Sequence, residues 1–200
     1  MFGHTHIPFR QFPRLFPVVT ALFSVQAVFF LIMTFLGGTQ YIPNLIRFGA
    51  LEPLLVSYGE WWRLVVPIFI HIGLFHFLFN SFALYLFGPQ LEWLFGRISF
   101  LFLYLFSGFV GNLMTYWYMI WFGQTGVSAG ASGSIYGLMG VYLYLIIRRA
   151  IEPEVSKGLL AMIGISVLIS ILDPQINLIA HLGGLVTGFL LTGILLRPKR

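Results

Sequence analysis

Long apolar runs are the feature that most restricts what this chain can fold into. Residues 17–36 carry no charged side chain. As an α-helix, this run would be about 30 Å long, which is the thickness of the hydrocarbon core of a bilayer. Comparable runs follow at residues 71–94, 98–120, 131–147, 158–172 and 176–196. The pattern predicts an all-α polytopic membrane protein with six spans.

The composition supports a membrane protein. Charged residues make up 8% of the chain and hydrophobic residues 58%, whereas soluble domains carry about 25% charged residues. The first run is too long for a signal peptide and lacks a small-residue cleavage site, so we expect a retained span. We therefore expect one six-helix domain at 17–196, flanked by short tails at 1–16 and 197–200.

The chain offers little for metal or redox chemistry. It contains no cysteine, so it has neither a disulfide nor a thiolate nucleophile. His4 and His6 could bind a metal as a pair, but two ligands with no others nearby make a poor site. We expect a mobile tail there, with no metal and no cofactor.

The longest stretch between spans, residues 37–70, is too apolar for a freely solvated loop. It contains the pair Trp61 and Trp62 together with Arg47 and Arg63. Aromatic side chains favour the headgroup level of a membrane. We expect short helices that lie in the interface.

The distribution of basic residues predicts the orientation. The net charge is +5, with eleven Lys and Arg residues. Nine of them fall on the side of the N-terminus, and only Arg47 and Arg63 fall on the other side. The nine are Arg10, Arg14, Arg97, Arg148, Arg149, Lys157, Arg197, Lys199 and Arg200. Basic residues collect on the cytoplasmic side, so both termini are predicted to be cytoplasmic. Because these residues flank the spans, the positive charge does not indicate nucleic-acid binding.

Three polar residues interrupt the second apolar run: His71, His76 and Asn80. The last two are four residues apart and share one helix face. Polar groups within a span are costly and usually face a bundle or a water-filled cavity. Alone, this pattern fits both a functional site and hydrogen bonds that hold helices together.

A serine between glycines opens the fourth run, within Gly130-Ala131-Ser132-Gly133. A serine hydroxyl is a weak nucleophile unless a base takes its proton. His181 begins the sixth run and, by the charge count, lies near the same outer face as Ser132. The small-residue pairs Gly133/Gly137 and Gly184/Gly188 would let these two helices approach closely.

The remaining groups predict a dyad with an oxyanion site. No acidic residue is placed to orient His181, because Asp173 ends the preceding run and serves as a cap or turn. Tyr136, one turn after Ser132, could pack its ring on the imidazole. His76, Asn80 and the Ser132 backbone N–H are candidate oxyanion donors, each contributing roughly 3–4 kcal/mol by analogy with soluble proteases.

Taken together, these residues resemble the rhomboid family of intramembrane serine proteases over essentially the whole chain. The matching motifs are His71-x4-His76-x3-Asn80, Gly130-Ala131-Ser132-Gly133 with Tyr136, Ala180-His181-x2-Gly184-x3-Gly188, Trp62-Arg63 and Glu92-x3-Gly96. The resemblance implies Ser132 as nucleophile, His181 as general base, and His76 and Asn80 as oxyanion donors. His71, Gly130, Gly133 and Gly184 are then supporting residues.

The resemblance also implies a compact six-helix fold whose active site opens to the outer face. The substrate would be a transmembrane helix of another protein, part of which unwinds before attack. The fifth helix would control substrate access. The partners are then transmembrane substrates and membrane lipid, in what we expect to be a bacterial inner membrane. The sequence does not indicate an oligomeric state.

Two other functions fit parts of the pattern. A catalytically silent relative would bind membrane clients without cutting them, but such proteins lose the serine or the histidine. A small transporter or channel would use His71, His76, Asn80 and Asn112 as a polar path. The spans contain no internal repeat of the kind many transporters show, which disfavours that alternative.

Overall fold

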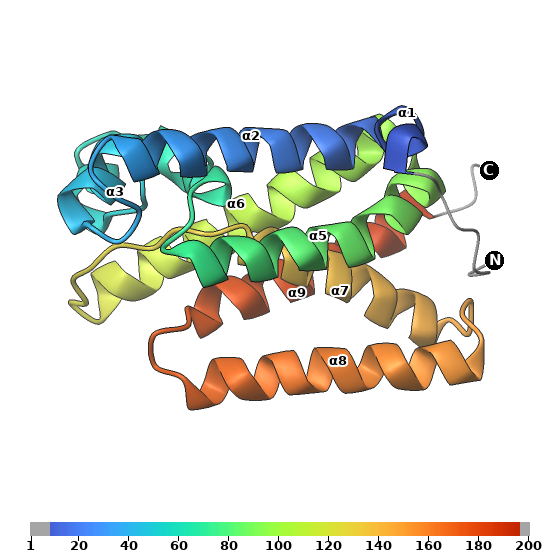
Figure 1. The fold of residues 1–200 in the computed structure, drawn as a ribbon. Helices are drawn as coiled ribbons and strands as arrows, with labels where there is room; N and C mark the ends of the chain where they lie inside the picture. The colour runs from blue at the N-terminus through green and yellow to red at the C-terminus, as the bar shows by residue number, and fades with distance from the viewer. Residues whose placement is uncertain (1–8, 197–200) are drawn as a thin grey trace.

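The computed structural model describes residues 9–196, where helices joined by loops make up the fold (Figure 1). Residues 1–8 and 197–200, and with them the His4 and His6 pair and the predicted C-terminal tail, lie outside the described residues. The long helices are α2 (Pro17–Phe35), α5 (Leu74–Phe95), α6 (Arg97–Trp121), α7 (Ser132–Ile147), α8 (Pro153–Leu172) and α9 (Leu178–Leu195). The short ones are η1 (Phe9–Gln11), α1 (Phe12–Leu15), α3 (Ile42–Phe48), α4 (Pro53–Ser57), η2 (Trp61–Leu64) and η3 (Val66–Phe69).

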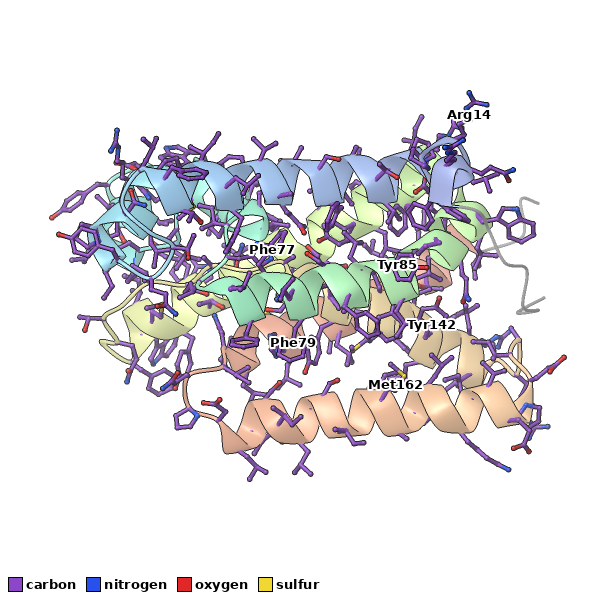
Figure 2. All side chains as sticks on the ribbon, viewed as in Figure 1. Arg14, Phe77, Phe79, Tyr85, Tyr142 and Met162 are labelled. Carbon is purple, nitrogen blue, oxygen red and sulfur yellow. The ribbon has the colours of Figure 1, made fainter. Side chains whose placement is uncertain are left out.

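Four of the helices, α2, α6, α8 and α9, are long and apolar enough to cross a membrane. The helix α7 is apolar but shorter, at 16 residues. The outward side chains of the bundle are largely apolar, as Phe79 and Tyr85 on α5 illustrate in Figure 2. Such a surface needs lipid around it. The chain is an integral, multi-pass membrane protein.

The helix α7 lies at the centre of the bundle. Eleven of its 16 residues are buried, and α5, α6, α8 and α9 all pack against it. It begins part-way along the bundle, where the loop after α6 runs inward (Figure 1). A helix that is apolar on all faces is expected in such a position.

Glycines bring α7 and α9 into direct backbone contact. A Cβ atom on Gly184 would collide with the carbonyl oxygen of Gly133, and one on Gly188 would collide with that of Gly137. On the neighbouring face, a Cβ on Gly111 of α6 would lie 2.6 Å from the Ala180 carbonyl oxygen. Small residues permit this approach in membranes, where packing and hydrogen bonds hold helices together.

Two helix boundaries differ from those expected from the apolar runs. The helix α5 begins at Leu74 rather than at His71, because Gly73 takes a left-handed φ of 81° that breaks the helix before it. The helix α8 begins at Pro153, five residues before the apolar run. Its first turns are polar, and Glu154 pairs with Lys157 at 2.9 Å on the surface. Pro153 stands at the first helical position, where its missing N–H costs nothing.

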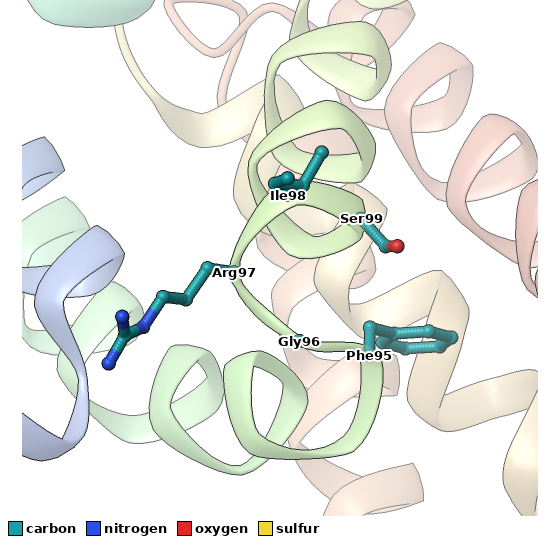
Figure 3. Close-up of a pocket in the computed structure, with 5 residues that line it drawn as sticks. All are labelled: Phe95, Gly96, Arg97, Ile98 and Ser99. Atoms are coloured by element: carbon teal, nitrogen blue, oxygen red, sulfur yellow. The ribbon is translucent and has the colours of Figure 1, made fainter.

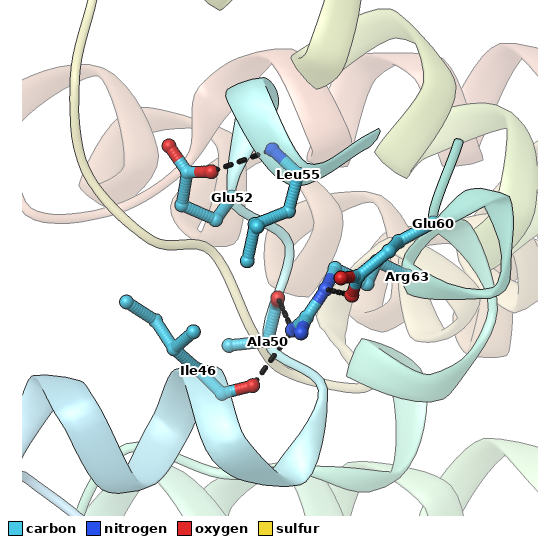
Figure 4. Close-up of polar contacts among 6 residues, drawn as sticks. All are labelled: Ile46, Ala50, Glu52, Leu55, Glu60 and Arg63. Carbon is cyan, nitrogen blue, oxygen red and sulfur yellow. Dashed lines mark hydrogen bonds and ion pairs between the residues drawn. The ribbon is translucent and has the colours of Figure 1, made fainter. Parts of the chain in front are cut away.

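The segment between α2 and α5 folds into the short elements α3, α4, η2 and η3, as the aromatic content predicted. Arg63 is buried at its centre and donates to the carbonyl oxygens of Ile46 (2.7 Å) and Ala50 (3.0 Å) (Figure 4). It also pairs with Glu60 at 2.6 Å, and its guanidinium lies 4.4 Å from the Trp62 ring centroid. A buried charge is stable only when it is paired and hydrogen-bonded in this way.

The same segment forms hydrogen bonds with the loop that precedes α7. Leu51 and Ser128 form an antiparallel bridge with two bonds of 2.9 Å. The Gly130 N–H donates to the Pro67 carbonyl at 2.9 Å. The position at which α7 begins therefore depends on residues far earlier in the chain.

Glu92, which the sequence analysis named only in the Glu92-x3-Gly96 motif, lies in the last turn of α5 and is 3% exposed. Its carboxylate accepts the backbone N–H groups of Val18 (3.0 Å) and Val19 (2.8 Å) at the start of α2. These donors have no partner within their own helix, and the helix dipole favours negative charge there.

The glycine contact predicts a stability difference between two alanine variants. Gly188→Ala places a Cβ against the Gly137 carbonyl and should lower the free energy of unfolding by about 1–3 kcal/mol. Gly164→Ala in α8 places its Cβ in open space and should be neutral or raise stability by up to about 1 kcal/mol. Unfolding in mixed detergent micelles measures both, and equal stabilities would contradict the packing described here.

Candidate active site

Ser132 is the first residue of α7. The loop before it makes a turn at Gly130, whose φ is 139°. Residues other than glycine rarely adopt this backbone angle. Because the Gly130 N–H is bonded to Pro67, the serine has a fixed position at the N-terminal end of the helix. The positive end of the helix dipole therefore lies beside its hydroxyl.

His181 lies in the first turn of α9 and is 6% exposed. Its Nε2 lies 2.8 Å from Ser132 Oγ. The two side chains come from separate helices, and the glycine contact just below them holds those helices together. The arrangement suits proton transfer from a hydroxyl to an imidazole.

The Tyr136 ring stacks on the imidazole of His181. The ring centroids are 4.0 Å apart and the planes are inclined by 14°. The tyrosine hydroxyl lies 2.8 Å from Ser170 Oγ on α8. The imidazole is thus packed on one face, and both of its nitrogens have a partner, Ser132 Oγ at Nε2 and Ser170 Oγ at Nδ1, which fixes its rotamer.

The His76 ring, from α5, lies beside Gly130, two residues before the serine. A Cβ on Gly130 would lie 2.6 Å from His76 Cε1 and 2.7 Å from Nε2, so only glycine leaves room for this ring. The Ile72 N–H donates to His76 Nδ1 at 3.3 Å. In a neutral imidazole, one nitrogen accepts and the other donates, so this bond assigns the proton to Nε2. That nitrogen is the one beside Gly130.

Asn80 lies one turn further along α5 and is 6% exposed. Its Nδ2 donates to the His76 carbonyl at 2.8 Å, which leaves the second hydrogen of the amide free for another acceptor. His71 lies before α5 and is fully buried. Its ring stands edge-on to those of His76 (5.3 Å) and Phe77 (5.6 Å), so it supports His76 from behind.

Gly133 and Gly184 do not reach the dyad themselves but provide the backbone contact beneath it. Among residues 9–196, no group of three His, Asp or Glu side chains could hold a metal ion. An open hollow lies at the turn between α5 and α6, lined by Phe95, Gly96, Arg97, Ile98 and Ser99 (Figure 3). Because His76 lies near the other end of α5, this hollow is not part of the site.

Two residues that the sequence analysis gave no role also shape the site. Asn177 caps α9 by accepting from the Ala180 N–H at 3.0 Å. It donates to Thr115 Oγ1 (3.0 Å) and to Ser128 Oγ (2.9 Å), and so joins α9 to α6 and to the loop before α7. An Asn before an apolar helix is a cap signal that could have been recognised. The other is Ser170, whose oxygen lies 2.8 Å from His181 Nδ1.

Comparison with known proteins identifies the family of this chain. The family model of the Rhomboid domain matches residues 58–198, a range that includes every side chain of the candidate active site. The chain belongs to the rhomboid family. It is 40% identical to YdcA of Bacillus subtilis (strain 168) over 193 residues, covering 96% of this chain and 94% of YdcA.

Longer rhomboid relatives also match. The chain is 34% identical to rhomboid protease GluP of Bacillus subtilis (strain 168) over 186 residues, which are 92% of this chain and 36% of GluP. It is 33% identical to RHOMBOID-like protein 1 of Arabidopsis thaliana over 223 residues, covering 96% of this chain and 56% of that protein. This rhomboid chain thus spans about a third to a half of these two relatives.

The role of Asn177 predicts a graded loss of stability. Asn177→Ala removes the cap and both bridging bonds and should lower the free energy of unfolding by about 1–2 kcal/mol or more. Asn177→Asp keeps an acceptor for the Ala180 N–H but loses the two donated bonds, so it should fall between the parent and the alanine variant. Unfolding in detergent measures the order, and an alanine variant as stable as the parent would contradict it.

Proposed function

We propose that this rhomboid family member hydrolyses a peptide bond in or near the transmembrane segment of other membrane proteins, with Ser132 and His181 as a catalytic dyad. The chain is a serine-type intramembrane protease, in keeping with its family. The observation that supports the dyad most directly is the 2.8 Å separation between Ser132 Oγ and His181 Nε2.

Ser132 Oγ and His181 Nε2 both take part in each of two steps, formation of an ester on the enzyme and hydrolysis of that ester. Ser132 Oγ attacks the carbonyl carbon of the substrate peptide while its proton passes to His181 Nε2. The C–N bond breaks as Nε2 gives that proton to the leaving nitrogen, which leaves an ester on Ser132. Water then attacks the ester and gives a proton to Nε2. The ester C–O bond breaks, the acid product leaves, and the proton returns to Ser132 Oγ.

The negative charge that develops on the substrate oxygen needs donors. We assign this role to the His76 Nε2–H, the free amide hydrogen of Asn80 and the Ser132 backbone N–H. The bond from Ile72 to His76 Nδ1 supports His76 as a donor at Nε2. A fixed donor in a site with little water contributes about 3–4 kcal/mol to transition-state stabilisation.

The substrate is a transmembrane helix. Because its peptide bonds are already hydrogen-bonded within the helix, part of it must unwind before Ser132 can reach a carbonyl. Helix-breaking residues near the cut and a small residue just before it ease this step. Access past α8 is consistent with its sparse packing, since only three of its 20 residues are buried.

We place the domain at residues 17–196, with six helices crossing the bilayer and short tails on either side. The described basic residues support both termini in the cytoplasm. Six basic residues lie in the described part of the segments predicted to be cytoplasmic. Arg10 is in η1, Arg14 in α1 and Arg97 at the start of α6, while Arg148 and Arg149 are in the α7–α8 connection and Lys157 is in the first turns of α8. These segments share one end of the bundle, and α3 lies at the other (Figure 1). The site then opens to the outer face of a bacterial inner membrane.

The alternative of a silent client-binding protein requires a broken dyad, and here both groups are present and in contact. Cleavage decides between the two functions. Ser132→Ala and His181→Ala should each lower the cleavage rate of a single-span model substrate in detergent by about 10⁴-fold or more. Both variants should unfold like the parent. A fluorophosphonate probe should label the parent and not Ser132→Ala. A Ser132→Ala variant that cleaves as fast as the parent would overturn the assignment.

The oxyanion role of His76 is tested by a pair of glycine variants. Gly130 and Gly126 have nearly the same backbone angle, with φ of 139° and 140°. A Cβ at residue 130 meets the His76 ring, whereas one at residue 126 meets only Met119 Cε at 4.0 Å. Gly130→Ala should therefore lower kcat by about 10–10³-fold, and Gly126→Ala should change it far less. Equal losses would show that backbone strain alone is responsible.

A further inference from the structure

We infer that Ser170 of α8 is a positioning residue that holds His181 in the protonation form needed for catalysis. The inference rests on the proposed function and adds a third side chain to the dyad. Ser170 is 3% exposed and lies near the end of α8. Its oxygen is 2.8 Å from His181 Nδ1, which is the ring nitrogen that faces away from Ser132.

The direction of the hydrogen bonds follows from what each group can donate. Ser170 has one hydroxyl proton, which it donates to the carbonyl oxygen of Ser166 at 2.8 Å. A carbonyl can only accept, so this bond has only one direction. The Ser170 oxygen must then accept from its other two partners, the Tyr136 hydroxyl and His181 Nδ1. Both of its lone pairs are used.

This direction fixes the tautomer of His181. With the proton on Nδ1, the neutral ring has a bare nitrogen at Nε2. The bare nitrogen faces Ser132 Oγ at 2.8 Å and can accept the hydroxyl proton. The opposite tautomer would present an N–H to Ser132 and could not act as its base. In soluble triads, an aspartate performs this orienting role, and loss of the correct tautomer there lowers kcat by about 10⁴-fold.

A neutral hydroxyl suits this site better than a carboxylate. No acidic side chain contacts His181 in the part of the chain that the structure describes, and a charged carboxylate within a membrane domain would be costly to bury. An uncharged oxygen that accepts two bonds satisfies Nδ1–H without that cost. When the ring takes the second proton, Nδ1–H still has an acceptor in Ser170.

The test replaces one hydroxyl at a time. Ser170→Ala removes the acceptor and should lower kcat by about 10–100-fold with KM little changed. Ser170→Thr keeps a hydroxyl that can also bond to the carbonyl four residues earlier, so it should recover most of the rate. Ser156→Ala is the matched control, because Ser156 is a buried serine of α8 that bonds to Ile151, about 21 Å along the helix from Ser170.

A spectroscopic readout separates positioning from general damage to the fold. In protein with ¹⁵N-labelled histidine, the His181 ring of the parent should show a protonated Nδ1 and a bare Nε2. The signals are assigned by comparison with His181→Ala. In Ser170→Ala, this preference should be lost, and in Ser170→Thr it should remain.

The outcomes distinguish this inference from the function on which it rests. If Ser132→Ala is inactive while Ser170→Ala keeps the parent kcat and tautomer, the positioning role is wrong and the protease assignment stands. A loss in Ser156→Ala equal to that in Ser170→Ala would also overturn it, since packing of α8 would then explain both. If Ser132→Ala remains active, the proposed function itself fails.

Discussion

The structure depends on the direct backbone contact between α7 and α9. Gly184 meets the carbonyl of Gly133, and Gly188 meets that of Gly137. In a bilayer the surrounding lipid is as apolar as the side chains, so helices are held by close packing rather than by exclusion from water. The same contact sets the spacing of the two helix starts, and with it the 2.8 Å between Ser132 and His181. Fold and candidate chemistry therefore share one constraint.

The sequence predicted those parts of the fold that rest on local patterns. The apolar runs gave the long helices, because hydrophobic length is a direct physical requirement of a span. The glycine pairs pointed to the close approach of α7 and α9, because small residues at a spacing of four line one helix face. Short elements between α2 and α5 followed from the aromatic content there. The match to the Rhomboid domain agrees with the family that the motifs indicated.

Long-range contacts of single polar side chains could not be predicted from the sequence. Glu92 ends an apolar run, and nothing near it in the sequence indicates that its carboxylate caps α2, more than 70 residues earlier in the chain. Ser170 reads as an ordinary polar residue of an apolar helix, because a serine that bonds within its own helix is common in membranes. Its contact with His181 depends on the packing of α8 against α7 and α9, which no local spacing encodes.

The sparse packing of α8 has a consequence for the timing of events at the site. This helix has three buried residues, and one of them is Ser170, whose oxygen lies 2.8 Å from the imidazole Nδ1 of His181 on α9. Any displacement of α8 that separates these groups deprives the imidazole of its outer partner. If a substrate is admitted by such a displacement, proton transfer at Ser132 would be slowed for as long as the helix stays displaced. The enzyme would cut fastest once α8 had closed again around its substrate.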